Sequence, residues 1–130
     1  MLKDPSQGQL QPLITLYSQG QLEQALSHAS HMQQKFPNSA VIYNILGATN
    51  AGLGSFAAAI DSYKQALKLK PDYAEAYNNM GVALQDQGDL AAAIDSYKQA
   101  LKLEPDYADA YNNMGNALQE QGDLAAAIDS

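Results

Sequence analysis

Apolar residues recur every three or four positions along most of this chain, and short polar breaks with Gly or Pro separate the runs. This spacing matches the 3.6-residue turn of an α-helix. On a helical wheel of residues 108–121, Tyr111, Met114 and Leu118 fall about 140–200° from Asp109. Asn113, Asn116 and Glu120 fall within about 40° of Asp109. The pattern therefore predicts amphipathic helices with one apolar and one polar face.

Residues 72–105 contain the signals that begin and end two such helices. Asp72 is followed three residues later by Glu75, a capping-box pattern that predicts a helix from about Tyr73 to Asp86. Gly88 is suited to close that helix in the left-handed conformation. Asp89 then caps a second helix from about Leu90 to Leu103, which Pro105 ends. Two helices of similar length joined by a tight turn lie antiparallel.

The same unit is repeated along the chain with a period of 34 residues. Ala57–Ala74 and Ala91–Ala108 differ only at Lys70 and Glu104. Ala74–Ser96 and Ala108–Ser130 differ at three positions. Self-similarity of this kind is the signature of a repeat protein. We divide the chain into a degenerate N-terminal capping repeat (1–39), two full repeats (40–73 and 74–107) and a truncated repeat (108–130).

The two terminal units depart from this pattern. The first has Pro12 where later units have Leu46 or Met80, so its first helix is expected to begin near Gln9, with Pro12 in the first turn. In the last unit we expect a turn at Gly122 and a short second helix, Leu124–Ser130. That short helix leaves part of the preceding apolar face uncovered.

The 34-residue period and the residues that recur in each unit resemble those of the tetratricopeptide repeat family. The residues that carry the resemblance are Tyr43, Leu46, Gly47, Gly54, Ala59, Tyr63, Ala66 and Pro71, then Tyr77, Met80, Gly81, Leu84, Gly88, Ala93, Tyr97, Ala100 and Pro105, and finally Tyr111, Met114, Gly115, Leu118, Gly122 and Ala127. The resemblance implies an all-α fold, a right-handed superhelical stack of antiparallel helix pairs. Because this family binds many different ligands, it does not identify one.

In the tetratricopeptide repeat family the first helices line a concave groove, and here that face is rich in amides and acids. Side-chain amides both donate and accept hydrogen bonds, so they suit the backbone of an extended peptide. The face resembles the asparagine-lined groove of O-linked N-acetylglucosamine transferases and of repeat-bearing bacterial transferases; a merely solvated polar face is the alternative. The predicted groove residues are Asn44, Glu75, Asn78, Asn79, Gln85, Asp86, Asp109, Asn112, Asn113, Asn116, Gln119 and Glu120.

The three units after the N-terminal one each carry a glycine inside the first helix, where Gly costs about 1 kcal/mol relative to Ala. A recurring cost of this kind indicates close packing. We expect these glycines to face the small residues of the second helices. The expected pairs are Gly47 with Ala59, Gly81 with Ala93, and Gly115 with Ala127.

Composition and charge exclude several classes of function. Seven lysines and no arginine oppose fourteen acidic residues, giving a net charge of −7, which argues against nucleic-acid binding. Without cysteine there is no thiolate metal site or cysteine nucleophile. His28 and His31 are interpreted as surface residues, and no nucleophile–base pair stands out. We therefore expect no enzyme activity, no metal and no cofactor.

The favoured function is a scaffold that binds a polypeptide partner, neutral or basic in character. One alternative is the substrate-recruiting arm of a larger transferase, and another is a self-assembling structural module. The uncovered C-terminal end favours a homo-oligomer. No run approaches the 18 apolar residues of a membrane span, and the first ten residues lack a signal-peptide core. These features predict a cytoplasmic protein with no membrane partner.

Overall fold

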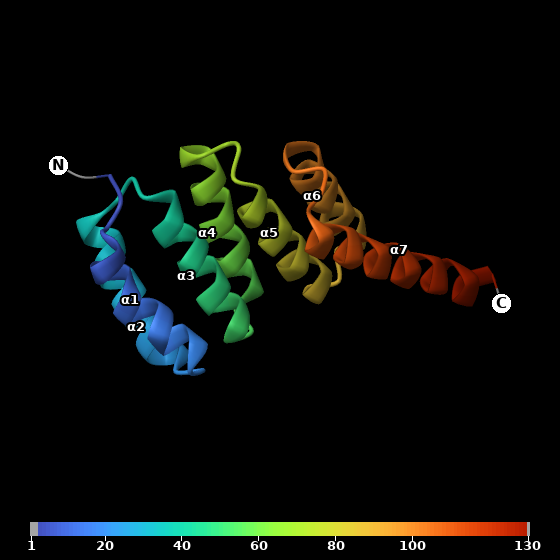
Figure 1. Ribbon diagram of the computed structural model, residues 1–130. Coiled ribbons are helices and arrows are strands. Elements are labelled where there is room, and N and C mark those ends of the chain that lie inside the picture. The colour runs from blue at the N-terminus through green and yellow to red at the C-terminus, as the bar shows by residue number, and fades with distance from the viewer. Residues whose placement is uncertain (1–2, 130) are drawn as a thin grey trace. The chain divides into compact units, whose positions relative to one another are not determined.

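The computed structural model describes residues 3–129, and within that range it contains seven α-helices and no β-strand (Figure 1). The all-α prediction is confirmed. The helices are α1 (Gln7–Ser18), α2 (Leu22–Lys35), α3 (Ala40–Gly52), α4 (Phe56–Leu69), α5 (Ala74–Asp86), α6 (Leu90–Leu103) and α7 (Ala108–Asp129).

The helices belong to two compact units, Met1–Pro71 with α1 to α4 and Asp72–Ser130 with α5 to α7. In the first unit each helix packs on the next along the chain. Its core is built around Leu13, Met32 and Ile42, which are buried against the alanines of α2. In the second unit α6 packs on both α5 and α7, and α5 also contacts α7. Ile94 and Tyr97 of α6 form the centre of that core.

The turn between α5 and α6 has the predicted chemistry. Gly88 has a φ of 95°, a left-handed conformation in which a side chain would be strained. The Asp89 carboxylate accepts a hydrogen bond from the Ala92 backbone N–H at 3.2 Å and so caps α6. The expected capping box at Asp72 is wrong. Tyr73 occupies the N-cap position of α5, and its side chain makes no capping hydrogen bond to the helix.

The first helix begins earlier than expected. Ser6 caps α1 by accepting from the Gln9 N–H, and the Gln9 side chain accepts from the Ser6 N–H in return. This reciprocal pair satisfies two backbone donors and sets the start of the helix at Gln7. Pro12 therefore lies in the second turn of α1 rather than the first, and α1 continues through it.

The predicted turn at Gly122 is absent. Instead, α7 runs as one helix of 22 residues, and its second half projects beyond α5 and α6 (Figure 1). Continuing the helix in line through Gly122 adds one backbone hydrogen bond for each residue.

Gly47 and Gly81 face tyrosines, not the alanines expected, and a Cβ on Gly115 would meet no atom within 4 Å. A Cβ placed on Gly81 would lie 2.5 Å from Cε1 of Tyr97, far inside van der Waals contact. Gly47 has the same relation to Tyr63. Both tyrosines are at most 2% exposed. The glycine therefore removes a side chain so that a large ring can lie flat against the backbone of the first helix.

Gly81 and Gly115 occupy equivalent positions, but no ring covers Gly115. Substitution by Ala should therefore change the free energy of unfolding in opposite directions at the two positions. Gly81→Ala should destabilise the fold by about 1–3 kcal/mol, since the added methyl group overpacks a buried ring. Gly115→Ala should stabilise by up to about 1 kcal/mol, because a Cβ there meets no atom within 4 Å and Ala is the better helix former. Urea unfolding at low protein concentration measures both changes. Shifts of the same sign would contradict the ring-on-glycine packing.

Candidate functional site

Asparagines of consecutive repeats meet between α5 and α7. The Asn113 amide donates a hydrogen bond to the Asn78 side-chain oxygen at 3.1 Å. Asn78 is 6% exposed, so its oxygen is largely cut off from water. A buried acceptor of this kind needs a partner. Asn78 therefore holds α7 against α5 and leaves little surface of its own for a ligand.

A second bridge joins three helices. The Gln85 amide nitrogen donates to a Glu120 carboxylate oxygen at 2.6 Å, and the Gln85 oxygen accepts from the Tyr97 hydroxyl at 2.8 Å. Tyr97, which packs on Gly81, is thus linked through the Gln85 side chain to Glu120 of α7, the first helix of the following repeat. Burial, together with smaller contributions from the Asp86 and Glu120 carboxylates, raises the pKa of Tyr97 to about 12.

These bridges divide the predicted groove residues into two sets. Both bridges join positions 35 residues apart, one more than the repeat period. Asn78 and Gln85 therefore occupy the side of α5 that packs on the next repeat. Their equivalents on α7, Asn112 and Gln119, are exposed. The sequence did not reveal this division, since it appears only when one repeat is docked on another.

The remaining polar side chains of α5 and α7 border a shared polar face of the second unit. Glu75, Asp86, Asp109 and Asn116 are exposed, while Asn79 is half-buried. Asn113 and Glu120 contribute to this face and to the bridges at once. We call this set the amide face: Glu75, Asn79, Asp86, Asp109, Asn113, Asn116 and Glu120.

Asn44 lies on α3, in the first unit, and is 5% exposed. Its position in the repeat matches that of Asn78, which is buried in the same way. The equivalent position on α7, Asn112, is exposed instead. Whether the predicted groove residues contact a ligand remains a prediction.

Tyr107 lies beside the amide face and was not among the predicted residues. Burial raises the pKa of Tyr107, the Glu75 and Asp109 carboxylates raise it further, and a hydrogen bond with Asn78 opposes them. The phenol therefore stays neutral and lies close to both carboxylates. A possible sequence signal was the recurrence of the Pro-Asp-Tyr-Ala segment at residues 71–74 and 105–108.

The amide face has a negative electrostatic character. It includes four carboxylates, and neither α5 nor α7 contains a lysine or arginine. Residues 72–130 carry eleven acidic side chains and two lysines, both on α6. An anionic ligand gains nothing from such a face, whereas a cationic or neutral one meets carboxylates and amides.

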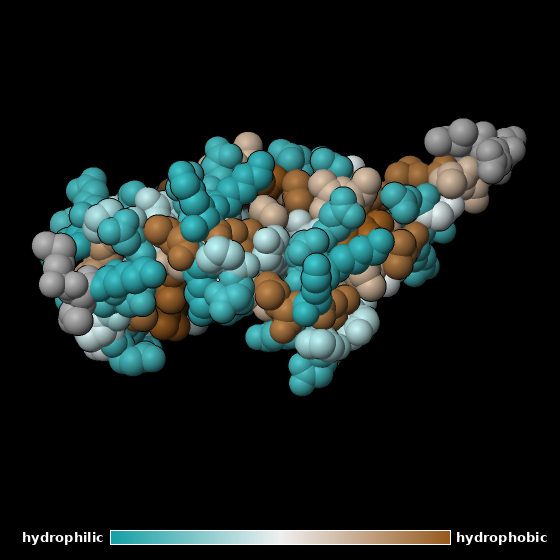
Figure 2. Space-filling view, turned by 90° about the horizontal axis from the view of Figure 1, so that it is seen from above, coloured by the Kyte–Doolittle hydropathy of each residue, from teal (hydrophilic) through white to brown (hydrophobic). Residues whose placement is uncertain are grey.

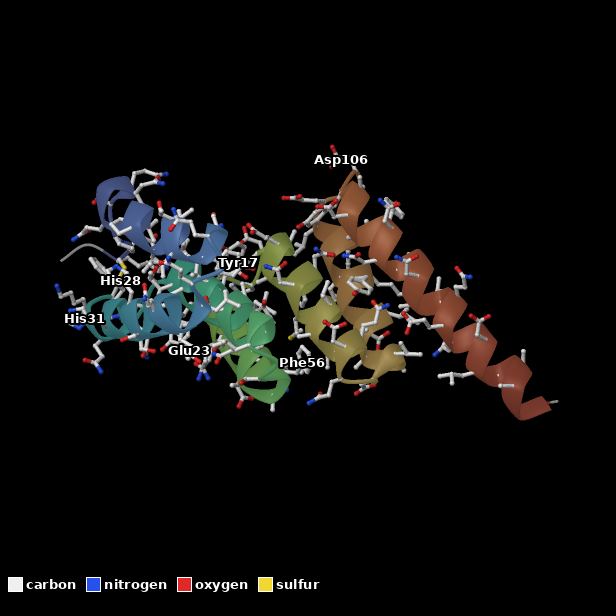
Figure 3. All side chains as sticks on the ribbon, turned by 90° about the horizontal axis from the view of Figure 1, so that it is seen from below. Tyr17, Glu23, His28, His31, Phe56 and Asp106 are labelled. Atoms are coloured by element: carbon white, nitrogen blue, oxygen red, sulfur yellow. The ribbon has the colours of Figure 1, made fainter. Side chains whose placement is uncertain are left out.

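The two histidines lie on α2, in the first unit, and Glu23 lies near the opposite end of that helix (Figure 3). His31 is exposed and His28 is half-buried. A shallow hollow of about 250 Å³ beside them is lined by Pro12, Met32 and Phe36 among others. Over the described part of the chain, no three His, Asp or Glu side chains gather closely enough to hold a metal ion.

Antiparallel helix pairs with a 34-residue period and a ring-on-glycine contact define an α-helical repeat protein. A sequence model of the tetratricopeptide (TPR) repeat matches residues 51–88 and 84–122. The chain belongs to the TPR family. A search of curated proteins finds no match to it.

Solved structures agree with this assignment. The first TPR of Spaghetti (RPAP3), bound to the HSP90 peptide SRMEEVD, has a TM-score of 0.84 at 23% identity, with 94% of this chain and 99% of that chain covered. The Sgt2 TPR domain from Aspergillus fumigatus has a TM-score of 0.88 at 13% identity, covering 95% and 85%. MamA has a TM-score of 0.81 at 28% identity, covering 88% and 67%. These similarities confirm an all-α TPR fold.

Nowhere between residues 3 and 129 does a helix combine the length and the apolar character that crossing a bilayer demands.

Removing the Asn113 amide should destabilise the second unit. Asn113→Ala leaves the buried Asn78 oxygen without this donor, which costs about 1–3 kcal/mol. Asn112→Ala is the matched control, because it removes the adjacent but exposed amide of the same helix. Urea unfolding of both variants measures the difference. Equal stability of the two variants would mean that the bridge contributes nothing.

Tyr97→Phe should change how stability depends on pH. The folded pKa of about 12 lies above the ordinary value of 10.0, so the neutral phenol is favoured in the folded chain. The stability that the fold gains from the neutral phenol is fully present below pH 10 and is lost as the pH rises through about 12. At pH 7 the variant should be less stable by about 0.5–1.5 kcal/mol, the contribution of the bond to Gln85.

The difference in free energy of unfolding between the wild type and Tyr97→Phe should then become smaller from pH 10 to pH 12. Thermal melts across this range measure this difference. The control is Tyr17→Phe, which alters a tyrosine that is 41% exposed. A difference that stays constant with pH for Tyr97→Phe would show that the phenol is not held neutral by the fold.

Proposed function

We propose that this chain is a TPR scaffold that binds an extended segment of another polypeptide along the amide face. The observation that carries the proposal is the row of half-buried or exposed amides and exposed carboxylates on α5 and α7, fixed in register by the Asn78–Asn113 and Gln85–Glu120 bridges. Side-chain amides that are already positioned lose little freedom when they pair with a peptide backbone. The peptide-bound TPR of Spaghetti supports this use of the fold.

The expected ligand is neutral or basic. In the second unit the first helices supply carboxylates and no cation, and α1 and α3 in the first unit also lack lysine and arginine. The HSP90 peptide of Spaghetti and the HSP70 peptide SGPTIEEVD of the second RPAP3 domain are acidic and end in Asp. This chain has no lysine or arginine on a first helix to pair with such a terminal carboxylate. We therefore infer a ligand chemistry different from that of those two relatives.

Selection from a display library of random 12-residue peptides against the intact chain tests this function. Recovered binders should be depleted in Asp and Glu relative to the starting library. Their affinity should fall about tenfold when Asn79→Ala and Asn116→Ala are combined, which corresponds to two hydrogen bonds of about 0.5–1.5 kcal/mol each. Gln99→Ala, an exposed amide on the second helix α6, is the control and should leave affinity unchanged.

The peptide SRMEEVD provides the opposite test. With no cation on the first helices, its free-acid and amidated forms should bind equally weakly. A strong preference for the free acid would contradict the inferred ligand chemistry. If the selected peptides bind the Asn79→Ala, Asn116→Ala double variant with unchanged affinity, the binding site does not lie on the amide face.

A further inference from the structure

The first unit has two adjoining hollows along the pair of helices α1 and α2. The smaller one, of about 250 Å³, combines apolar side chains with nitrogen donors, and its lining is Gln9, Pro12, His28, His31, Met32, Lys35 and Phe36. The second hollow shares His28 and His31 with the first. We call the smaller one the α1–α2 hollow. Among the described residues that line it there is no Asp or Glu.

Apolar exposure alone does not mark a binding site on this surface. Hydrophilic and apolar side chains are interspersed over the face of the molecule shown in Figure 2, a mixture that is usual on protein surfaces. The α1–α2 hollow is different, because both its open space and its nitrogen donors depart from the repeat at the same place. Each departure is visible when the hollow is compared with equivalent positions along the chain.

The open space comes from two residues of α1. Gln9 and Pro12 occupy the repeat positions of Tyr43 and Leu46, one period later. Tyr43 and Leu46 both pack on the core of the first unit. Gln9 and Pro12 are exposed instead, and they fill less volume than a tyrosine and a leucine. The two substitutions therefore leave space beside α1 that the repeat pattern would fill.

The nitrogen donors of the hollow are likewise particular to this unit. Three positions of α2 carry His28, His31 and Lys35 where α6 carries Ser96, Gln99 and Leu103. His31 and Lys35 are exposed and His28 is half-buried, so their nitrogens are accessible to a ligand. Phe36, also half-buried, adds an aromatic ring where α6 is followed by Glu104. Open space, donors and an added ring thus coincide in one unit.

The charges around the hollow favour an anion, although the chain carries a net charge of −7. Helix α1 has no charged residue, and the one acidic residue of α2, Glu23, lies near the opposite end of that helix (Figure 3). The twelve residues from Glu23 to Lys35 span about 18 Å, more than the Debye length of about 8 Å in physiological salt. Asp4 accepts a hydrogen bond from the Ser39 hydroxyl at 2.7 Å and does not line the hollow.

The volume of the hollow restricts the ligand to a small molecule. Pockets for drug-sized ligands measure about 300–1,000 Å³, and the hollow of about 250 Å³ lies below that range. It has room for one ring or one short branched chain and is too small for an extended peptide. An ammonium group and imidazole N–H groups are suited to a carboxylate, since charge-assisted hydrogen bonds are the stronger ones.

We propose that the α1–α2 hollow binds a small amphipathic carboxylate, in which one ring or short branched chain carries the acid group. The apolar part lies against Pro12, Met32 and Phe36, and the carboxylate accepts hydrogen bonds from Lys35 and the two imidazoles. The site uses residues of the first unit alone and goes beyond the binding of a peptide along the amide face. A ligand of about ten non-hydrogen atoms should bind with a dissociation constant of about 1 mM.

Titration of the intact chain with phenylacetate at constant ionic strength, followed by NMR, tests the proposal. We expect saturable shifts confined to α1 and α2. Phenylacetamide has the same shape without the charge and should bind about fivefold more weakly. Acetate has the charge without the ring and should give no saturable shift. Equal affinity for phenylacetate and either comparison compound, or no saturable shift with phenylacetate up to about 20 mM, would overturn the proposal.

Variants of the chain locate the site. Lys35→Gln should weaken phenylacetate about fivefold and leave phenylacetamide unchanged, because only the charge is lost. Lys64→Gln, which alters an exposed lysine of α4, is the control and should change neither affinity. Gln9→Tyr combined with Pro12→Leu restores the residues of α3, fills the hollow and should abolish binding of both compounds.

Circular dichroism and thermal melts establish that the refilled variant is folded. A folded refilled variant that still binds phenylacetate would refute the assignment. If the refilled variant does not fold, the comparison of Lys35→Gln with Lys64→Gln decides alone, and equal affinities of the two for phenylacetate would count against the site. Peptide binding along the amide face is measured with other ligands, so either proposal can fail while the other stands.

Discussion

The packing of a tyrosine ring against a glycine backbone underlies two helix pairs of this protein, α3 with α4 and α5 with α6. Tyr63 and Tyr97 are the largest fully buried side chains, and each lies where its partner helix has no Cβ. A ring of this size fits between two helices only if one of them gives up a side chain. The glycine destabilises its own helix and allows the pair to approach closely. The pairing of α3 with α4 and of α5 with α6 depends on this exchange.

The tyrosines also orient the polar face. The hydroxyl of Tyr97 fixes Gln85, which in turn holds Glu120 of the next repeat. The apolar core and the polar surface of the second unit are therefore linked through one side chain. Among the described residues, every buried side-chain nitrogen or oxygen has a hydrogen-bond partner. The polar side chains of Gln85 and Glu120 therefore fix the register of α5 and α7 in addition to contacting solvent.

Much of the fold was predictable from the sequence, because local signals agreed with one another. The bounds of α6 follow from Asp89, the apolar period and Pro105, and the turn before it follows from Gly88. The end of α7 was not predictable in this way. Gly122 has the same immediate neighbours as Gly88, yet the chain turns at Gly88 and stays helical through Gly122, so the local sequence alone does not decide between a turn and a helix.

The candidate site was predictable only in part, for a related reason. The wheel correctly separated polar from apolar sides. It could not show that Asn78 faces the next repeat and not solvent, because the contact joins residues 35 positions apart. The packing of one repeat on the next decides which amides contact a neighbouring helix and which stay available to a ligand.

The bridge from Tyr97 through Gln85 to Glu120 also bears on how the repeats unfold. In a linear array the stability of each repeat and the coupling between neighbours are separate quantities. Contacts through methyl groups alone couple neighbours without strict geometry, so one repeat can open while the next stays folded. A chain of directed hydrogen bonds through three helices couples them more strictly. Opening of α7 removes the partner of Gln85, and loss of Gln85 loosens the ring that holds α6 on α5. The three helices of the second unit are thereby favoured to melt as one cooperative block.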